Sequence, residues 1–237
     1  MIQPASHRET IARCSLFAHL SLDEIDDIIA EGRTYDLPPG AFLFHQGEES
    51  TMMYVLISGR VKLSMVTDEG DQVIVNYFGP GEGLGIVVAL NEHPYPLSAE
   101  AIEPCSAVGW RQETMHDLMQ DNAQLAINGM KMVGGRFTQM MGRFQELATQ
   151  QVEQRVARAL MRLVRQFGRR TDEGLLIDIA LSREDLAQMT GTNLYNVSRI
   201  LSKWESNGLI ATGRKRITLL QAHEMVALAE DIPPPGS

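Results

Sequence analysis

Short apolar runs alternate with polar positions between residues 38 and 110, and glycines stand where one run ends and the next begins. Apolar residues recur there at every second position, as in half-buried strands: Val55, Ile57, Val61, Leu63 and Met65. This pattern predicts an antiparallel β-roll or barrel. Helical spacing on either side predicts two short flanking helices, one over residues 20–31 that begins at a Ser21 cap and one over residues 112–120.

From residue 130 to residue 147 the apolar positions alternate three and four apart, which is the heptad spacing of a helical seam. The seam consists of Met130, Val133, Phe137, Met140, Phe144 and Leu147. A parallel pair of such helices would make a homodimer, but one helix packed on its own β-roll would show the same spacing. Gly134, Gly135 and Gly142 each lower helix stability by about 1 kcal/mol relative to alanine, so close packing or flexibility must account for them.

Residues 182–210 have the pattern of a helix-turn-helix. Ser182 and Asp185 have the spacing of a capping box, which starts the first helix. Gly191 supplies the turn, because a residue without Cβ takes positive φ at little cost, and Asn193 caps the second helix. The spacing in that helix predicts a buried stripe of Val197, Ile200, Leu201 and Trp204. The outward positions are then Tyr195, Ser198, Arg199 and Ser202.

Two short apolar runs follow Gly208, and Gly213 with three cationic residues joins them. This pattern predicts a β-hairpin with a cationic tip, which would meet phosphates. A helix with a polar outer face is what a reader of the DNA major groove needs. The alternatives are two packed helices of an ordinary α-helical core and a solvated turn. Taken together, the two features favour a protein that binds duplex DNA.

The composition, with 44% apolar and 22% charged residues, is that of a globular chain. No apolar run approaches the roughly 20 residues of a spanning helix, and the start has no signal pattern, so we expect a cytoplasmic protein without a membrane partner. The net charge of −9 is unexpected for a DNA binder, but residues 1–148 carry −11 and residues 149–237 carry +2. Because attraction to phosphate acts over about a Debye length, this local balance matters more than the total.

The chain lacks the residues that several classes of protein need. Cys14 and Cys105 are the only cysteines, too few for a disulfide framework and wrongly spaced for a local metal site. Cupin enzymes share a β-roll but need clustered histidines and a glutamate, and His45 has no second histidine nearby. We therefore do not expect an enzyme. The alternative is a signal-binding module that regulates a partner protein without touching DNA, which the helix-turn-helix argues against.

An acidic β-roll, a long helix and a winged helix-turn-helix, in that order, resemble the CRP/FNR family of bacterial transcription regulators over nearly the whole chain. The matching residues are Pro39, Gly40, Gly47, Tyr54, Gly59, Pro80, Gly81, Gly85 and the block TGTNLYNVSRIL. The resemblance implies an α+β fold with an effector-sensing antiparallel β-roll of the cyclic-nucleotide-binding type (1–120), a dimerisation helix (121–150) and a winged helix-turn-helix domain (151–237). It also implies a homodimer that binds a small signal and recruits or blocks RNA polymerase at an inverted-repeat operator.

Family members read bases through positions that fall here on Tyr195, Ser198 and Arg199. Arg199 could donate two parallel hydrogen bonds to guanine O6 and N7, a contact worth about 1–3 kcal/mol of discrimination. Tyr195 replaces a glutamate that relatives often use to accept from cytosine, so we expect the half-site to differ outside the guanine. Phosphate contacts, which position the protein without reading sequence, are expected from Arg183, Thr192, Asn196, Lys203, Arg214 and Lys215.

The resemblance places the effector pocket at Leu84, Gly85, Ile86, Leu97, Ser98, Met140 and Met141. Relatives that bind cyclic AMP have a glutamate and an arginine where this chain has Ile86 and Leu97. A phosphate without its cation would carry an uncompensated desolvation cost, so cyclic AMP is not expected. Iron-sulfur relatives use four cysteines, so that cluster is excluded in its usual form.

This apolar pocket fits an apolar effector or a haem better. The blocks TGTNLYNVSR and PYPLSAEA are most similar to the regulators of nitrite and nitric oxide reductases, which implies a response to nitric oxide, with haem as one route. A haem needs an axial donor, and His45, His93, His116 or a methionine are the candidates. Isolated histidines are, however, more often surface or turn residues.

Overall fold

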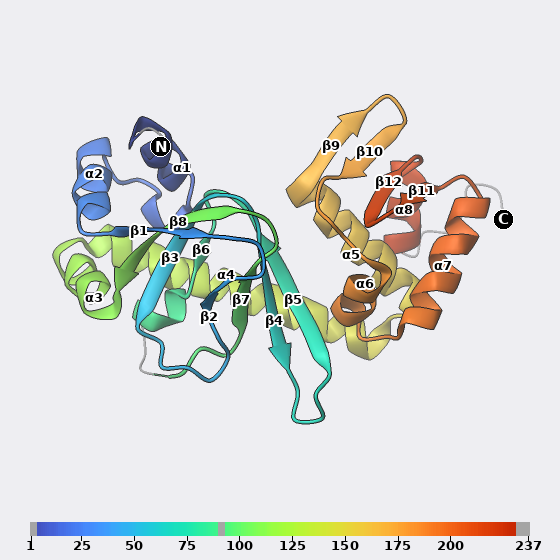
Figure 1. Cartoon of the computed structure of the whole chain (residues 1–237), viewed down its shortest axis with the longest axis horizontal. Coiled ribbons are helices and arrows are strands. Elements are labelled where there is room, and N and C mark those ends of the chain that lie inside the picture. The colour runs from blue at the N-terminus through green and yellow to red at the C-terminus, as the bar shows by residue number, and fades with distance from the viewer. Residues whose placement is uncertain (1–3, 90–92, 231–237) are drawn as a thin grey trace. The chain divides into compact units, whose positions relative to one another are not determined.

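The computed structural model describes residues 4–89 and 93–230, and the chain divides into two compact units, Met1–Met140 and Met141–Ser237. Figure 1 shows the helices and strands of both. The division falls inside helix α4 (Ala123–Thr149), so this one helix contributes to both units.

The first unit is built around two four-stranded antiparallel sheets (Figure 1), with strand orders β1-β8-β3-β6 and β2-β7-β4-β5. The strands are β1 (Arg33–Leu37), β2 (Phe42–Phe44), β3 (Met52–Ser58), β4 (Val61–Val66), β5 (Gln72–Phe78), β6 (Gly83–Leu84), β7 (Ser98–Ala101) and β8 (Cys105–Arg111). The helices are α1 (Pro4–Ala12), η1 (Ser15–Phe17), α2 (Leu22–Ala30), η2 (Ile86–Ala89) and α3 (Gln112–Asp121). The predicted β-roll and both flanking helices are confirmed, although the first strand begins at Arg33, ahead of the expected range.

Strand β3 is buried on both faces, which explains its unbroken apolar run. Met53, Val55 and Ile57 pack with the helices, whereas Tyr54 and Leu56 belong to the apolar cluster between the two sheets. A strand covered on both sides needs no polar positions, so strict alternation describes only part of this β-roll.

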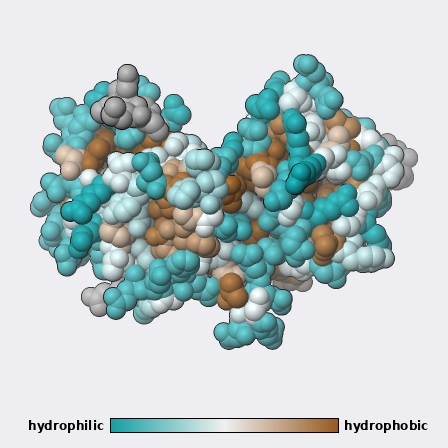
Figure 2. Space-filling model, viewed as in Figure 1, coloured by the Kyte–Doolittle hydropathy of each residue, from teal (hydrophilic) through white to brown (hydrophobic). Residues whose placement is uncertain are grey.

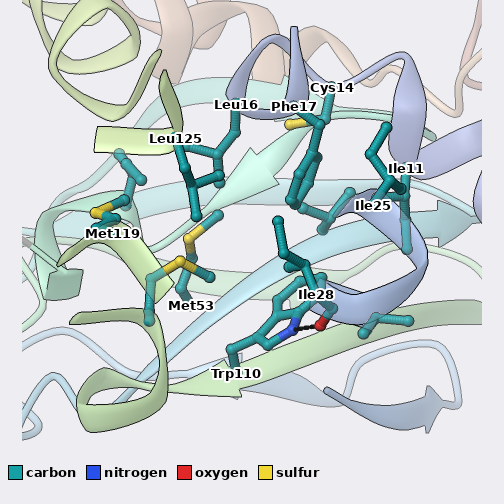
Figure 3. Close-up of a cluster of buried hydrophobic side chains, with 14 of the residues drawn as sticks. Ile11, Cys14, Leu16, Phe17, Ile25, Ile28, Met53, Trp110, Met119 and Leu125 are labelled. Carbon is teal, nitrogen blue, oxygen red and sulfur yellow. Dashed lines mark hydrogen bonds between the residues drawn. The ribbon is translucent and has the colours of Figure 1, made fainter. Parts of the chain in front are cut away.

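The helical side of the core centres on Trp110 of β8, which is fully buried (Figure 3). Its indole Nε1 donates a hydrogen bond of 2.6 Å to the Ile28 carbonyl, and its ring lies 6.0 Å from the ring of Phe17. Ile28 is in α2, which begins at Ser21 as predicted: the Glu24 amide donates to the Ser21 hydroxyl at 3.3 Å. The capping box thus fixes where α2 starts and sets Ile28 against the tryptophan.

The second unit contains α5 (Val152–Phe167), β9 (Gly168–Thr171), β10 (Gly174–Ile177), α6 (Arg183–Thr190), α7 (Leu194–Ser206), β11 (Ile210–Gly213), β12 (Arg216–Leu219) and α8 (Ala222–Glu230). Its sheet has the order β11-β12-β10-β9, all antiparallel. The predicted winged helix-turn-helix is confirmed. The hairpin β9–β10 adds two strands that the sequence pattern did not predict.

Most residues on the face drawn in Figure 2 are hydrophilic, with hydrophobic residues gathered in smaller patches. Within residues 4–89 and 93–230, no helix combines the length and the apolar character that crossing a bilayer requires.

Candidate functional site

The turn between α6 and α7 forms as its residues predict. The Ser182 hydroxyl accepts from the Asp185 amide at 3.0 Å, and the Asp185 carboxylate accepts from the Ser182 amide at 2.7 Å. Gly191 ends α6 in the left-handed region with φ of 61°, and the Asn193 side chain then accepts from the Asn196 amide at 2.9 Å. Two capped ends and one glycine therefore set the path of the chain from one helix to the next.

Helix α7 has one buried face and one exposed face. Val197, Leu201 and Trp204 are buried, as predicted. Tyr195, with 67% of its surface exposed, and Arg199 lie on the outside, and the Arg199 guanidinium lies 5.9 Å from the centre of the Tyr195 ring. Ser198 is half-buried next to Arg199, and Ile200, which was expected in the buried stripe, is half-buried as well.

Trp204 and Lys203 share one carboxylate on α5. Glu153 accepts from the Trp204 indole at 2.9 Å and from Lys203 Nζ at 3.0 Å. Lys203 would have to share this ion pair to reach a phosphate. The same carboxylate fixes the end of α7 onto α5, because the indole is buried and the bond satisfies its only donor.

The other residues expected to contact phosphates lie around α7. The side-chain amide of Asn196 donates to the Thr192 hydroxyl at 3.0 Å, so these two side chains hold each other at the start of the helix. Arg214 and Lys215 are exposed at the tip of the β11–β12 hairpin, where Lys215 takes a φ of 53°. The hairpin tip is cationic, as predicted.

A groove of about 380 Å³ lies between α6, α7 and the hairpin, and Arg183, Lys215 and Arg216 line part of it. The hairpin is fixed to α7 by Glu205, whose carboxylate accepts from both the amide and the hydroxyl of Thr212 at 2.8 Å. These two hydrogen bonds hold the pKa of Glu205 below its usual value. The groove thus brings three cationic side chains together beside α7.

The apolar seam of α4 is largely exposed in the single chain. Met130, Phe137, Met140, Phe144 and Leu147 have between 53% and 66% of their surface exposed. Val133 differs, because it packs against the helical core of the first unit. The alternative of a helix packed on its own β-roll therefore describes the beginning of α4, where Leu125, Asn128 and Gly129 are buried, while the place of Val133 in a dimer seam stays a prediction.

The residues expected to line an effector pocket are dispersed. Leu84 and Leu97 pack in the cluster between the sheets, whereas Ile86 is fully buried on the helical side. The Ser98 hydroxyl accepts from the Gln46 amide at 2.9 Å. Gly85 connects the two clusters with a φ of 71°, and Met140 and Met141 are exposed on α4.

Aromatic rings pack in the space between the two sheets. The rings of Phe44 and Tyr95 are stacked with 4.0 Å between their centres, and the Tyr54 ring lies 6.3 Å from that of Phe44. The Tyr95 hydroxyl donates to the Met52 carbonyl at 2.6 Å and accepts from the Met52 amide at 2.9 Å. No role was predicted for Tyr95 from the sequence, yet its side chain fixes this apolar interior to β3.

The candidate haem ligands do not come together. His45, His93 and His116 are all exposed, and they lie on different elements. Among the described residues no group of three or more histidine, cysteine or acidic side chains could hold a metal ion. The cysteines are also apart and buried, and burial raises the pKa of Cys14 to about 11, which makes it a poor thiolate donor.

Two family models match this chain, one over the β-roll and one over the winged helix-turn-helix. The cyclic nucleotide-binding domain matches residues 35–122, and the Crp-like helix-turn-helix domain matches residues 154–228. Together they cover well over half of the sequence, in the order that the family requires. The chain belongs to the CRP/FNR family. It is thus a transcription regulator of the CRP/FNR type.

Other CRP/FNR proteins match over nearly the full length. The transcriptional activator protein anr of Pseudomonas aeruginosa is 28% identical over 231 residues, which cover 95% of this chain and 93% of that protein. The CRP-like cAMP-activated global transcriptional regulator of Mycobacterium tuberculosis is 23% identical, covering 93% and 99%. The structure of the c-di-GMP responsive regulator CLP of Xanthomonas campestris has a similar fold, with a TM-score of 0.75 at 21% identity over 84% and 99% of the two chains. These relatives are regulators rather than enzymes.

Three charged side chains that support the helix-turn-helix of this CRP/FNR protein were missed from the sequence: Glu153, Arg155 and Glu205. Glu153 and Arg155 act on residues 35 or more positions away, so no local spacing identifies their partners. Only the strong amphipathic pattern of Val152–Phe167 indicates that α5 packs against other elements.

Proposed function

We propose that this protein is a homodimeric regulator that binds an inverted-repeat DNA site through α7 and acts on RNA polymerase there. In this proposal residues 1–120 sense the signal, 121–150 form the dimerisation helix and 151–237 bind DNA. The observation that supports it best is the outer face of α7, where Tyr195 and Arg199 are exposed on a helix whose opposite face is buried. Such a helix presents donors and acceptors to base edges without losing its own packing.

The dimer is proposed from the apolar side chains that α4 leaves exposed. Phe137 and Phe144 have 58% and 66% of their surface exposed, which is costly for large apolar side chains in water. A second copy of the same helix would bury them in a symmetric seam. Two recognition helices related by twofold symmetry then match an inverted repeat with half-sites about one DNA turn apart.

Binding of the full chain to a mixed-sequence duplex, titrated at rising salt, tests the DNA function against the module that regulates only a protein partner. A DNA-binding regulator is expected to bind weakly and to lose affinity linearly on a logarithmic salt scale, because phosphate contacts release counterions. No binding at low salt would favour the protein-partner module. The mass in solution, measured by light scattering, is expected to be that of two chains.

Cyclic AMP is expected to leave the thermal midpoint of the protein unchanged. The positions that would contact its ribose and phosphate hold Ile86 and Leu97, and Ile86 is fully buried among apolar side chains. A ligand that binds only the folded state raises the midpoint with concentration, so a thermal shift titration detects binding directly. A midpoint that rises with cyclic AMP concentration would contradict this prediction.

The proposed signal is nitric oxide, with haem as the group that would receive it, because the blocks around Thr190 and Tyr95 are similar to the nitric oxide reductase regulators. Haem would supply an iron that binds the gas. The exposed His45, His93 and His116 offer single axial donors but no preformed pair.

Added haem is therefore expected to give a Soret band that one histidine variant alone removes. We would titrate haem into the full chain and into His45→Ala, His93→Ala and His116→Ala. A spectrum unchanged from free haem would remove haem from the proposal. In that case the gas, if it is the signal, would have to act without haem.

A further inference from the structure

The last turns of α4 are joined to α5 by an ionic cluster. Glu146, whose side chain is only 13% exposed, accepts two hydrogen bonds of 2.8 Å from Arg162 and lies 3.7 Å from Arg158. Arg143, one turn earlier, is half-buried, and its desolvation together with nearby Arg162 lowers its pKa to about 10. Charged groups held in this way need fixed partners, so Arg143–Thr149 belongs structurally to the DNA-binding unit.

Arg155 connects this end of α4 to the turn of the helix-turn-helix. Its guanidinium donates to three backbone carbonyls: to Gln150 at 2.8 Å, to Thr190 at 2.9 Å and to Gly191 at 3.3 Å. Gln150 directly follows α4, whereas Thr190 and Gly191 end α6. One planar cation thus bridges two parts of the chain that are about 40 residues apart.

Leu147 makes a second connection between the same two parts. A Cβ added to Gly191 would lie 2.8 Å from Leu147 Cδ2, so the two residues are in close contact. The left-handed φ of 61° is what favours glycine at this turn, and Leu147 packs against the turn from the end of α4.

We propose that Arg155 is a positioning residue: it locks the helix-turn-helix to the end of α4, so that α7 moves with Arg143–Thr149 as one body. The proposal rests on the proposed function, because it takes α7 as the reader of DNA.

Hydrogen exchange of the full chain tests the lock without DNA. In the wild type, residues 143–151 are expected to exchange as slowly as α5. Arg155→Ala is expected to speed exchange at 147–151 and 190–192 about tenfold, the effect of losing a charge-assisted hydrogen bond. The matched control is Arg165→Ala, which removes an exposed arginine from the same helix. Exchange at 147–151 and 190–192 that is as fast in the wild type as in Arg155→Ala would overturn the proposal.

Selection of DNA sites distinguishes positioning from mere stabilisation. A rigid joint fixes the separation of two recognition helices, so the wild type and Arg165→Ala are expected to select one half-site spacing. Arg155→Ala is expected to accept several spacings while keeping the same half-site. Weaker binding with an unchanged spacing would overturn the positioning role. If the wild type selects no sequence, the proposed function fails instead, and the exchange experiment still decides whether the lock exists.

Discussion

Arg199→Ala is expected to abolish sequence-specific DNA binding and to leave weak, salt-sensitive binding to any duplex. The exposed guanidinium is the one group on the outer face of α7 that can donate two parallel hydrogen bonds to a guanine. Each such contact is worth about 1–3 kcal/mol of discrimination, and a dimer loses two of them. The phosphate contacts remain, so affinity for unrelated DNA is retained. Fluorescence anisotropy with a selected site and its scrambled version measures the specific and the non-specific affinity.

Arg165→Ala is the matched control for this variant, because it removes the same charge from an exposed position on α5. It is expected to lower affinity for both duplexes by a similar small factor and to leave their ratio unchanged. Equal discrimination by Arg199→Ala and the wild type would contradict the assigned role of Arg199. Tyr195→Ala is informative as well, since the Tyr195 ring lies beside the guanidinium and helps to orient it.

Phe144→Glu is expected to convert the dimer to monomers and, as a result, to lose the operator. Phe144 is the most exposed side chain of the seam, at 66%. Burying a phenylalanine contributes about 1.5–3 kcal/mol, and the symmetric dimer loses this contribution twice while two carboxylates meet across the seam. Light scattering at several protein concentrations reports the change in mass.

The control for the dimer variant is Gln145→Glu, which adds the same charge at an exposed position of α4 away from the seam. It is expected to remain dimeric. If Phe144→Glu also remains dimeric at micromolar concentration, α4 is not the dimer helix. If both variants become monomers, added charge rather than the apolar seam explains the result.

The helix-turn-helix was predictable because local rules determine it. Ser182 and Asp185 cap one another across three residues, Gly191 takes the one conformation it favours, and Asn193 caps the next helix. None of these depends on a distant partner. The buried stripe of α7 follows from helical periodicity alone, and its two deepest positions, Val197 and Leu201, are completely buried.

Contacts between distant residues were not predictable. Strand β9, with the sequence GRRT, is short and polar, so it shows no apolar alternation. It pairs with β10, which in turn pairs with β12 from a later part of the chain. The sequence around Lys203 indicates an unpaired surface cation, yet this side chain forms an ion pair with Glu153, fifty residues away. Val133 fits the heptad, but it is partly buried against the core of the first unit. Residue spacing predicts which face of a helix is apolar, but it does not predict which element packs against that face.

The predictions for the signal depend on the least local part of the fold. Residues assigned to one pocket by resemblance fall on two sides of β6, with Leu84 between the sheets and Ile86 among the helices. A single turn at Gly85 separates them, and its positive φ determines which side each residue faces. Residues two apart in an extended strand point to the same face, so the turn at Gly85 is what separates Leu84 from Ile86, and a shared pocket could not be derived from their proximity in sequence.

Selection of duplex fragments from a random pool by the full-length wild type tests whether paired α7 helices read DNA sequence through Arg199. We expect enrichment of an inverted repeat with a guanine in each half, the two halves centred about one DNA turn apart, and loss of that enrichment with Arg199→Ala. Enrichment of an unrepeated sequence, or of no sequence at all, would contradict it.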